Sequence, residues 1–92
     1  MYYVYIITNI GNSVLYTGVT NNILRRMYEH REKLVDGFSK RYNLFKLVHC
    51  EEFENILDAI KREKGFKNLS RARKMDLISS KNKLWEDLWL EF

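Results

Sequence analysis

The chain has 92 residues, a formal net charge of +4 and a pI near 9.3. Its length favours one domain, residues 1–92, and its hydrophobic content of 46% excludes a disordered tail. Because Cys50 is the only cysteine, an internal disulfide and a thiolate zinc site are excluded, and a cytoplasmic setting is expected. No apolar run reaches membrane-spanning length, so no membrane partner is expected, and the positive charge favours nucleic acid.

The first part of the chain predicts a hairpin followed by a helix. Residues 2–7 are β-branched or aromatic on both faces, which is typical of a central strand. Turn residues at 10–13 and a second run at 14–19 predict an antiparallel partner strand. Asn21 or Asn22 is expected to cap a helix that runs to about residue 35. The predicted core stripe of this helix is Leu24, Met27, Tyr28, Leu34 and Val35.

The second part predicts one more strand and further helices. Gly37 is expected near the end of the first helix, followed by a basic loop at residues 38–43 and a strand at 44–53. Helices are predicted at 55–67 and, capped by Ser70, from there to about residue 79. We expect the tail to form a short helix that packs on the core through Leu84, Trp85, Leu88 and Trp89. The order β-β-α-β-α-α indicates an α+β fold, a small three-stranded, mainly antiparallel sheet flanked by helices.

The hairpin brings two tyrosines and a glycine to one face. Tyr5, Tyr16 and Gly18 share that face whether Tyr5 lies opposite Gly18 or opposite Tyr16. One interpretation is a pair of phenols beside a glycine floor on which a phosphate approaches closely. The other is ordinary strand aromatics, with Gly18 at a bulge.

Arg26 and His30 lie one turn apart on the first predicted helix, and Asn22 lies one turn earlier on the same line. Arg26 can offer a bidentate fork to a phosphate, and His30 can relay a proton near neutral pH. The alternative is a solvated helix edge with an exposed histidine.

Glu63 lies on the apolar stripe of the helix predicted at residues 55–67. The apolar members of that stripe are Ile56, Ala59, Ile60 and Phe66. An ionised carboxylate there is costly unless it is paired or binds a cation. One interpretation is an ion pair with Arg26 or a lysine. The other is a ligand for Mg²⁺, which needs only one or two carboxylates besides water and substrate oxygens.

Two basic sets can contact phosphates without reading sequence, although such runs also serve solubility alone. The first set is Lys61, Arg62, Lys64, Lys67, Arg71, Arg73 and Lys74. The second set is Lys33, Lys40 and Arg41.

Taken together, these residues resemble the GIY-YIG nuclease superfamily, in particular its small single-domain members. Residues 3–5 (Tyr-Val-Tyr) stand where the family has Gly-Ile-Tyr, and residues 16–18 (Tyr-Thr-Gly) stand for Tyr-Ile-Gly. Residues 19–30 are similar to the family helix that carries an arginine and a histidine, and residues 59–64 to the segment with the metal-binding glutamate. Asn82 is similar to the asparagine of the closing motif.

The resemblance implies a Mg²⁺- or Mn²⁺-dependent DNA endonuclease, in repair or recombination, with the metal on Glu63. The implied catalytic residues are Tyr5, Tyr16, Arg26, His30 and Glu63, with Tyr16 as general base and Tyr5 assisting it. The implied substrate-binding residues are Gly18, Asn22, Lys33, Lys40, Arg41, Lys67 and Asn82. Two rival functions remain open: a nucleic-acid-binding module without turnover, and an interaction protein that docks through Trp85 and Trp89.

Overall fold

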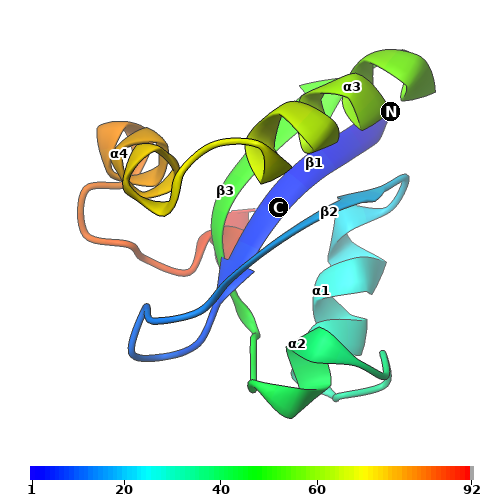
Figure 1. The fold of residues 1–92 in the computed structure, drawn as a ribbon. Helices are drawn as coiled ribbons and strands as arrows, with labels where there is room; N and C mark the ends of the chain where they lie inside the picture. Colours follow the sequence, from blue (N-terminus) through cyan, green and yellow to red (C-terminus); the bar gives the residue numbers. More distant parts are fainter. Residues whose placement is uncertain (92) are drawn as a thin grey trace.

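A small sheet carries helices on both of its faces (Figure 1). The computed structural model describes residues 1–91, with side chains through residue 89. The strands lie antiparallel in the order β2-β1-β3, and they are β1 (Tyr2–Thr8), β2 (Leu15–Thr20) and β3 (Lys46–Phe53). This arrangement confirms the predicted α+β fold, with the first strand in the centre of the sheet.

Three of the helices begin close to the predicted residues. The helices are α1 (Ile23–Arg31), α2 (Phe38–Arg41), α3 (Ile56–Lys67), α4 (Arg71–Lys81) and the short 3₁₀ helix η1 (Leu88–Glu91). Asn22, Asn55 and Ser70 cap α1, α3 and α4, because each side-chain oxygen accepts a hydrogen bond from a backbone N–H of the first turn. Within residues 1–91, no helix combines the length and apolar character needed to cross a membrane.

Alternation of side chains along β1 divides the core into two layers. Val4 and Ile6 point to one face of the sheet, and Tyr5 and Ile7 point to the other. The buried helical residues on the first face are Ala59, Phe66 and Ile78. Those on the second face are Ile23 and Met27. Helices α3 and α1 therefore cover opposite faces, and β2 is an edge strand between them (Figure 1).

The predicted stripe of the first helix is wrong in most of its members. The helix ends at Arg31 rather than at residue 35, and the chain turns at Lys33, which has a φ of 56°. Leu24, Tyr28 and Leu34 are exposed. The residues that α1 buries are Ile23, Met27 and His30, at spacings of four and three, so the helix is rotated to place a histidine on the core.

The predicted basic loop contains the short helix α2. Gly37 does not end α1 but precedes α2, where its φ of 103° suits glycine. The strand that follows begins at Lys46, two residues later than predicted. Between them Leu44 is buried in the α1 layer of the core.

The C-terminal tail returns to the sheet and is held by Asn82. The Asn82 Nδ2 donates to the Val48 carbonyl at 3.1 Å and to the Glu86 carbonyl at 2.8 Å, and its Oδ1 accepts from the Glu86 N–H at 2.9 Å. Trp85 is 8% exposed and donates from Nε1 to Ser79 Oγ at 2.9 Å, so it is a core residue and does not supply a docking face. Leu84, predicted to pack inward, is instead exposed.

A carboxylate fastens the tail to α1 and β3. Asp87 forms an ion pair with Arg31, the last residue of α1, and its other oxygen accepts from the N–H groups of Leu47 at 3.2 Å and Trp89 at 3.1 Å. The Arg31 guanidinium also lies 4.3 Å from the centre of the Trp89 ring. One side chain thus joins three segments that are distant in the sequence.

The variant Asn82→Ala should lower the free energy of unfolding by about 2 kcal/mol, because it leaves the buried Val48 carbonyl and two backbone groups of residue 86 without partners. Urea unfolding followed by circular dichroism measures this change. Asn68→Ala, at the exposed end of α3, is the matched control and should change stability little. Equal stability of the two variants would contradict the structural role given to Asn82.

Candidate active site

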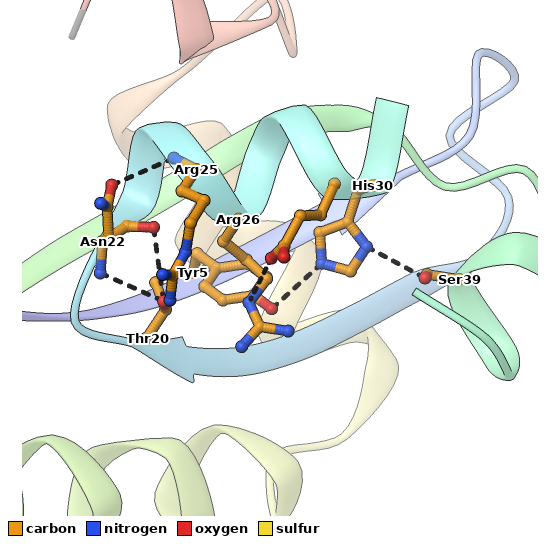
Figure 2. A network of polar contacts seen from close by, with 8 residues as sticks. Tyr5, Thr20, Asn22, Arg25, Arg26, His30 and Ser39 are labelled. Carbon is orange, nitrogen blue, oxygen red and sulfur yellow. Dashed lines mark hydrogen bonds and ion pairs between the residues drawn. The ribbon is translucent and has the colours of Figure 1, made fainter. Parts of the chain in front are cut away.

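A chain of hydrogen bonds joins the sheet, α1 and α2 beneath the surface. The Tyr5 hydroxyl lies 3.1 Å from His30 Nε2, and His30 Nδ1 lies 3.0 Å from Ser39 Oγ (Figure 2). All three residues are buried, and none is more than 5% exposed. His30 is therefore not the solvated edge residue that the helical pattern also allowed, and α1 is oriented to bring it against Tyr5.

Burial sets the protonation states of this chain. Desolvation, followed by the nearby positive charge of Arg26, lowers the pKa of His30 from 6.5 to about 4. Desolvation, followed by the neighbouring Tyr16, raises the pKa of Tyr5 well above 10. At pH 7 the imidazole is neutral and the Tyr5 phenol keeps its proton. The expectation that His30 titrates near neutral pH is therefore wrong.

Gly18 makes room for the Tyr5 ring. The two residues are paired across β1 and β2, which confirms one of the two predicted registers. A Cβ atom on Gly18 would lie only 2.5 Å from Tyr5 Cζ. The space above the glycine is thus filled by a phenol of the chain itself, and the interpretation of Gly18 as an open floor for a phosphate is wrong.

Arg26 extends from α1 across β2 beside the Tyr5 hydroxyl (Figure 2). Its Nε lies 3.8 Å from the Glu29 carboxylate, which is beyond hydrogen-bond distance, and this buried Nε has no hydrogen-bond partner among the residues that the structure describes. The guanidinium lowers the pKa of both Tyr5 and His30, so its charge acts on both groups. This N–H group is able to donate a hydrogen bond to an anionic ligand.

Tyr16 lies at the outer side of the same group. Its ring centroid is 6.5 Å from that of Tyr5 and 6.2 Å from that of His30. Unlike Tyr5, Tyr16 is half-buried. The two phenols that were predicted to work together therefore share one face of the sheet. Tyr5 is enclosed there, and Tyr16 is partly exposed.

Glu63 approaches from α3, on the other side of the sheet. Its side chain is 17% exposed, as its place on the apolar stripe predicts, and its Oε2 lies 3.6 Å from Nζ of the exposed Lys67. Of the two predicted partners, Arg26 or a lysine, Glu63 therefore pairs with a lysine, one helical turn along α3. The Glu63 charge nonetheless raises the pKa of Tyr5, so the carboxylate acts on the same hydroxyl as Arg26.

The proposed substrate-binding residues fall into two groups. Lys33, Lys40 and Arg41 are exposed on and before α2, where Lys40 forms an exposed ion pair with Asp36 at 3.5 Å. Asn22 is exposed but uses its side-chain oxygen to cap α1. Asn82 does not belong with these residues, because it is buried among backbone partners of the tail and β3.

Part of the basic surface on α3 is already neutralised. Arg62 donates from Nε and from a terminal guanidinium nitrogen to Glu51 at 3.0 and 3.2 Å, and it lies over the Phe66 ring at 4.3 Å. Burial raises the pKa of Glu51, but the hydrogen bonds from Arg62 and His49 outweigh this effect and hold the pKa below its usual value. Arg62 is therefore not free for a phosphate.

Ser39 is the member of this group that the sequence did not reveal. It lies in a helix of four residues, which is too short to show a periodic pattern. Its contact with His30 spans a turn and a glycine with positive φ. No local signal in the sequence indicates that this serine is buried.

Comparison with known proteins agrees with this geometry. Residues 1–76 match the family described as the GIY-YIG catalytic domain. The chain belongs to the GIY-YIG family. A GIY-YIG domain is usually a nuclease, and such domains act on nucleic acids. The resemblance inferred from the hairpin, α1 and α3 is thus confirmed.

Relatives of similar length share most of this GIY-YIG chain. It is 42% identical over 82 residues to a UPF0213 protein of Clostridium perfringens, covering 89% of this chain and 87% of that protein. It is 40% identical over 77 residues to a UPF0213 protein of Syntrophus aciditrophicus, covering 83% and 87%. The solution NMR structure of a UPF0213 protein from Bacillus halodurans is 32% identical, with a TM-score of 0.59 and coverage of 95% and 93%.

The variant Gly18→Ala should displace the Tyr5 ring and break its bond to His30, because the added methyl group overlaps the phenol. We expect a loss of about 2 kcal/mol in the free energy of unfolding, typical of overpacking. Gly11→Ala is the control, since a Cβ there meets nothing within 4 Å. An unchanged Tyr5 ring environment in NMR spectra of Gly18→Ala would contradict this packing.

The free energy of unfolding should fall as the pH drops from 6.5 to 5. In this range the unfolded chain protonates His30, with a pKa of 6.5, while the folded chain does not until about pH 4. The unfolded state binds more protons, so stability is lost on acidification by up to about 1.4 kcal/mol per pH unit. NMR titration of the imidazole and urea unfolding at several pH values measure both quantities.

Two variants, one for the test and one for the control, show whether His30 causes this pH dependence. His30→Gln should flatten the slope between pH 6.5 and 5, whereas Asn21→Ala, at an exposed position before α1, should leave it unchanged. A measured pKa near 6.5 in the folded protein would show that His30 is not desolvated.

Proposed function

We propose that the chain is a Mg²⁺-dependent phosphodiesterase that hydrolyses DNA. The observation that supports this most directly is the position of Arg26 beside the Tyr5 hydroxyl, where its buried Nε lacks a hydrogen-bond partner within the described part of the chain. A phosphate oxygen would complete this donor, and a guanidinium there would stabilise the charge that builds up on a pentacoordinate phosphorus. Membership of a family of nucleic-acid enzymes supports the same choice of ligand.

The two phenols suit different tasks. Tyr5 keeps its proton because burial raises its pKa, so it can bond and position but cannot accept the proton of an attacking water. Tyr16 is half-exposed and adjacent, and the family resemblance assigns it the role of general base. In this scheme Tyr16 acts as a phenolate, and its Oη would take the proton of the water that attacks phosphorus and become a neutral phenol. The bond from phosphorus to the leaving oxygen would break as the new P–O bond forms, and the leaving oxygen would take up a proton from water.

His30 would serve as a neutral anchor. With its pKa near 4, it holds the Tyr5 hydroxyl through Nε2 and is itself held by Ser39 through Nδ1. This arrangement fixes the phenol before substrate arrives, which lowers the reorganisation needed in the reaction.

The donor set around Glu63 fits Mg²⁺. The residues that the structure describes contain no cluster of three or more His, Cys, Asp or Glu side chains that could hold a metal by themselves. A single half-buried carboxylate is nevertheless enough for Mg²⁺, which completes its shell with water and substrate oxygens. Glu63 would hold the ion once its ion pair with the exposed Lys67 is broken. Mn²⁺ would fit the same site. When bound, the metal would polarise a phosphate oxygen and the leaving oxygen.

The test is cleavage of branched, nicked and single-stranded DNA in the presence of Mg²⁺. Glu63→Gln and Arg26→Ala should each lower the rate at least about 100-fold, the loss typical of removing a transition-state contact. Glu54→Gln and Arg25→Ala, which remove the same kinds of charge at exposed positions, are the controls and should stay within about twofold of the unmodified protein.

Equal cleavage by the unmodified protein and Glu63→Gln would end this assignment. DNA binding that weakens with salt, ignores Mg²⁺ and occurs without cleavage would instead identify a binding module of the same fold.

A further inference from the structure

A row of aromatic rings leads from the site to the protein surface. The Tyr16 and Phe38 rings are stacked, with centroids 6.1 Å apart and planes inclined by 27°. The Phe38 and Tyr42 rings follow with centroids 4.6 Å apart. The row thus begins at the half-buried phenol of the site and ends beyond α2.

The outer part of the row is open to solvent. Phe38 is 45% exposed and Tyr42 is 41% exposed. They stand four residues apart at the start and the end of α2, so they share one side of it. We call these two adjacent, partly exposed rings, Phe38 and Tyr42, the aromatic platform.

A hydrogen bond connects the helix of the platform to the site. Between its two rings in the sequence, Ser39 points inward and bonds to His30 at 3.0 Å. Gly37 sets the entry to α2 with its φ of 103°. The same contact that holds His30 therefore connects the helix of the platform to Tyr5.

Positive charge accompanies the rings. Lys40 and Arg41 are exposed on α2, and the Arg41 guanidinium lies 5.6 Å from the centre of the Tyr42 ring. Lys33 is exposed before α2. Aromatic faces beside flexible cations are the combination that binds single-stranded nucleic acid, because bases stack on the rings while the cations contact phosphates.

We infer that the aromatic platform binds an unpaired base of the DNA substrate, so that the site acts on a single-stranded segment. This inference rests on the proposed function, since it assigns a substrate class to the same site. In a duplex the faces of the bases are covered by their neighbours, so only an unpaired nucleotide can present a face to Phe38 and Tyr42. Duplex DNA would contact only the cations.

Binding without catalysis tests the platform. We would measure fluorescence anisotropy of a labelled single-stranded oligonucleotide and of a blunt duplex of the same sequence, in EDTA. The unmodified protein should bind the single strand more tightly. Phe38→Leu and Tyr42→Leu, which keep apolar bulk but remove a ring, should each weaken single-strand binding about tenfold and leave duplex binding unchanged.

Two further variants serve as matched controls. Tyr42→Phe keeps the ring and should retain the affinity of the unmodified protein. Tyr28→Leu removes an exposed ring from α1 outside the platform and should change neither affinity. A single-stranded probe that carries 2-aminopurine should lose fluorescence on binding the unmodified protein and lose less with Tyr42→Leu.

The outcomes separate this inference from the proposed function. No preference for the single strand, or an equal loss of single-strand and duplex binding in the two leucine variants, would overturn the platform even if the protein cleaves DNA. A platform effect of the expected size in a protein that cleaves nothing would uphold base binding and refute the phosphodiesterase.

Discussion

The contact between the Tyr5 ring and the bare backbone of Gly18 is the constraint on which the site depends. Because no side chain stands on Gly18, the phenol reaches past β2 and its hydroxyl meets His30. For this contact α1 must present His30 to the core, and α2 must pack against His30 through Ser39. A pair of residues opposite each other in a hairpin thus fixes two helices.

Charged residues from opposite faces of the sheet both act on the Tyr5 hydroxyl. Arg26 comes from α1 and Glu63 from α3, and these helices cover different faces. Gly18 lies on the edge strand β2, opposite Tyr5 on the central strand. Both charges act on the Tyr5 hydroxyl, with opposite effects on its pKa.

The sequence predicted those features that depend on short-range periodicity. Side-chain alternation limits Tyr5 to a position opposite Gly18 or Tyr16, and the structure has the first of these. The cap at Ser70 was predicted, and of the two candidate caps of the first helix the structure uses Asn22. The partial burial of Glu63 was predicted because the glutamate lies on an apolar stripe of its helix. What the sequence did not reveal depends on contacts between distant segments. The rotation of α1 that buries His30 is set by Tyr5, and α2 is too short to produce a pattern.

The contacts of Asp87 with Arg31 and the Leu47 backbone indicate where the folding unit ends. The stretch that matches the family stops at residue 76, yet Asp87 ties Arg31 to the backbone of β3, and Arg31 directly follows His30. A fragment that ends at residue 76 would lack Asp87, so Arg31 would lose its ion pair at the end of α1, next to the buried His30. Residues beyond the shared domain therefore help to keep its interior closed.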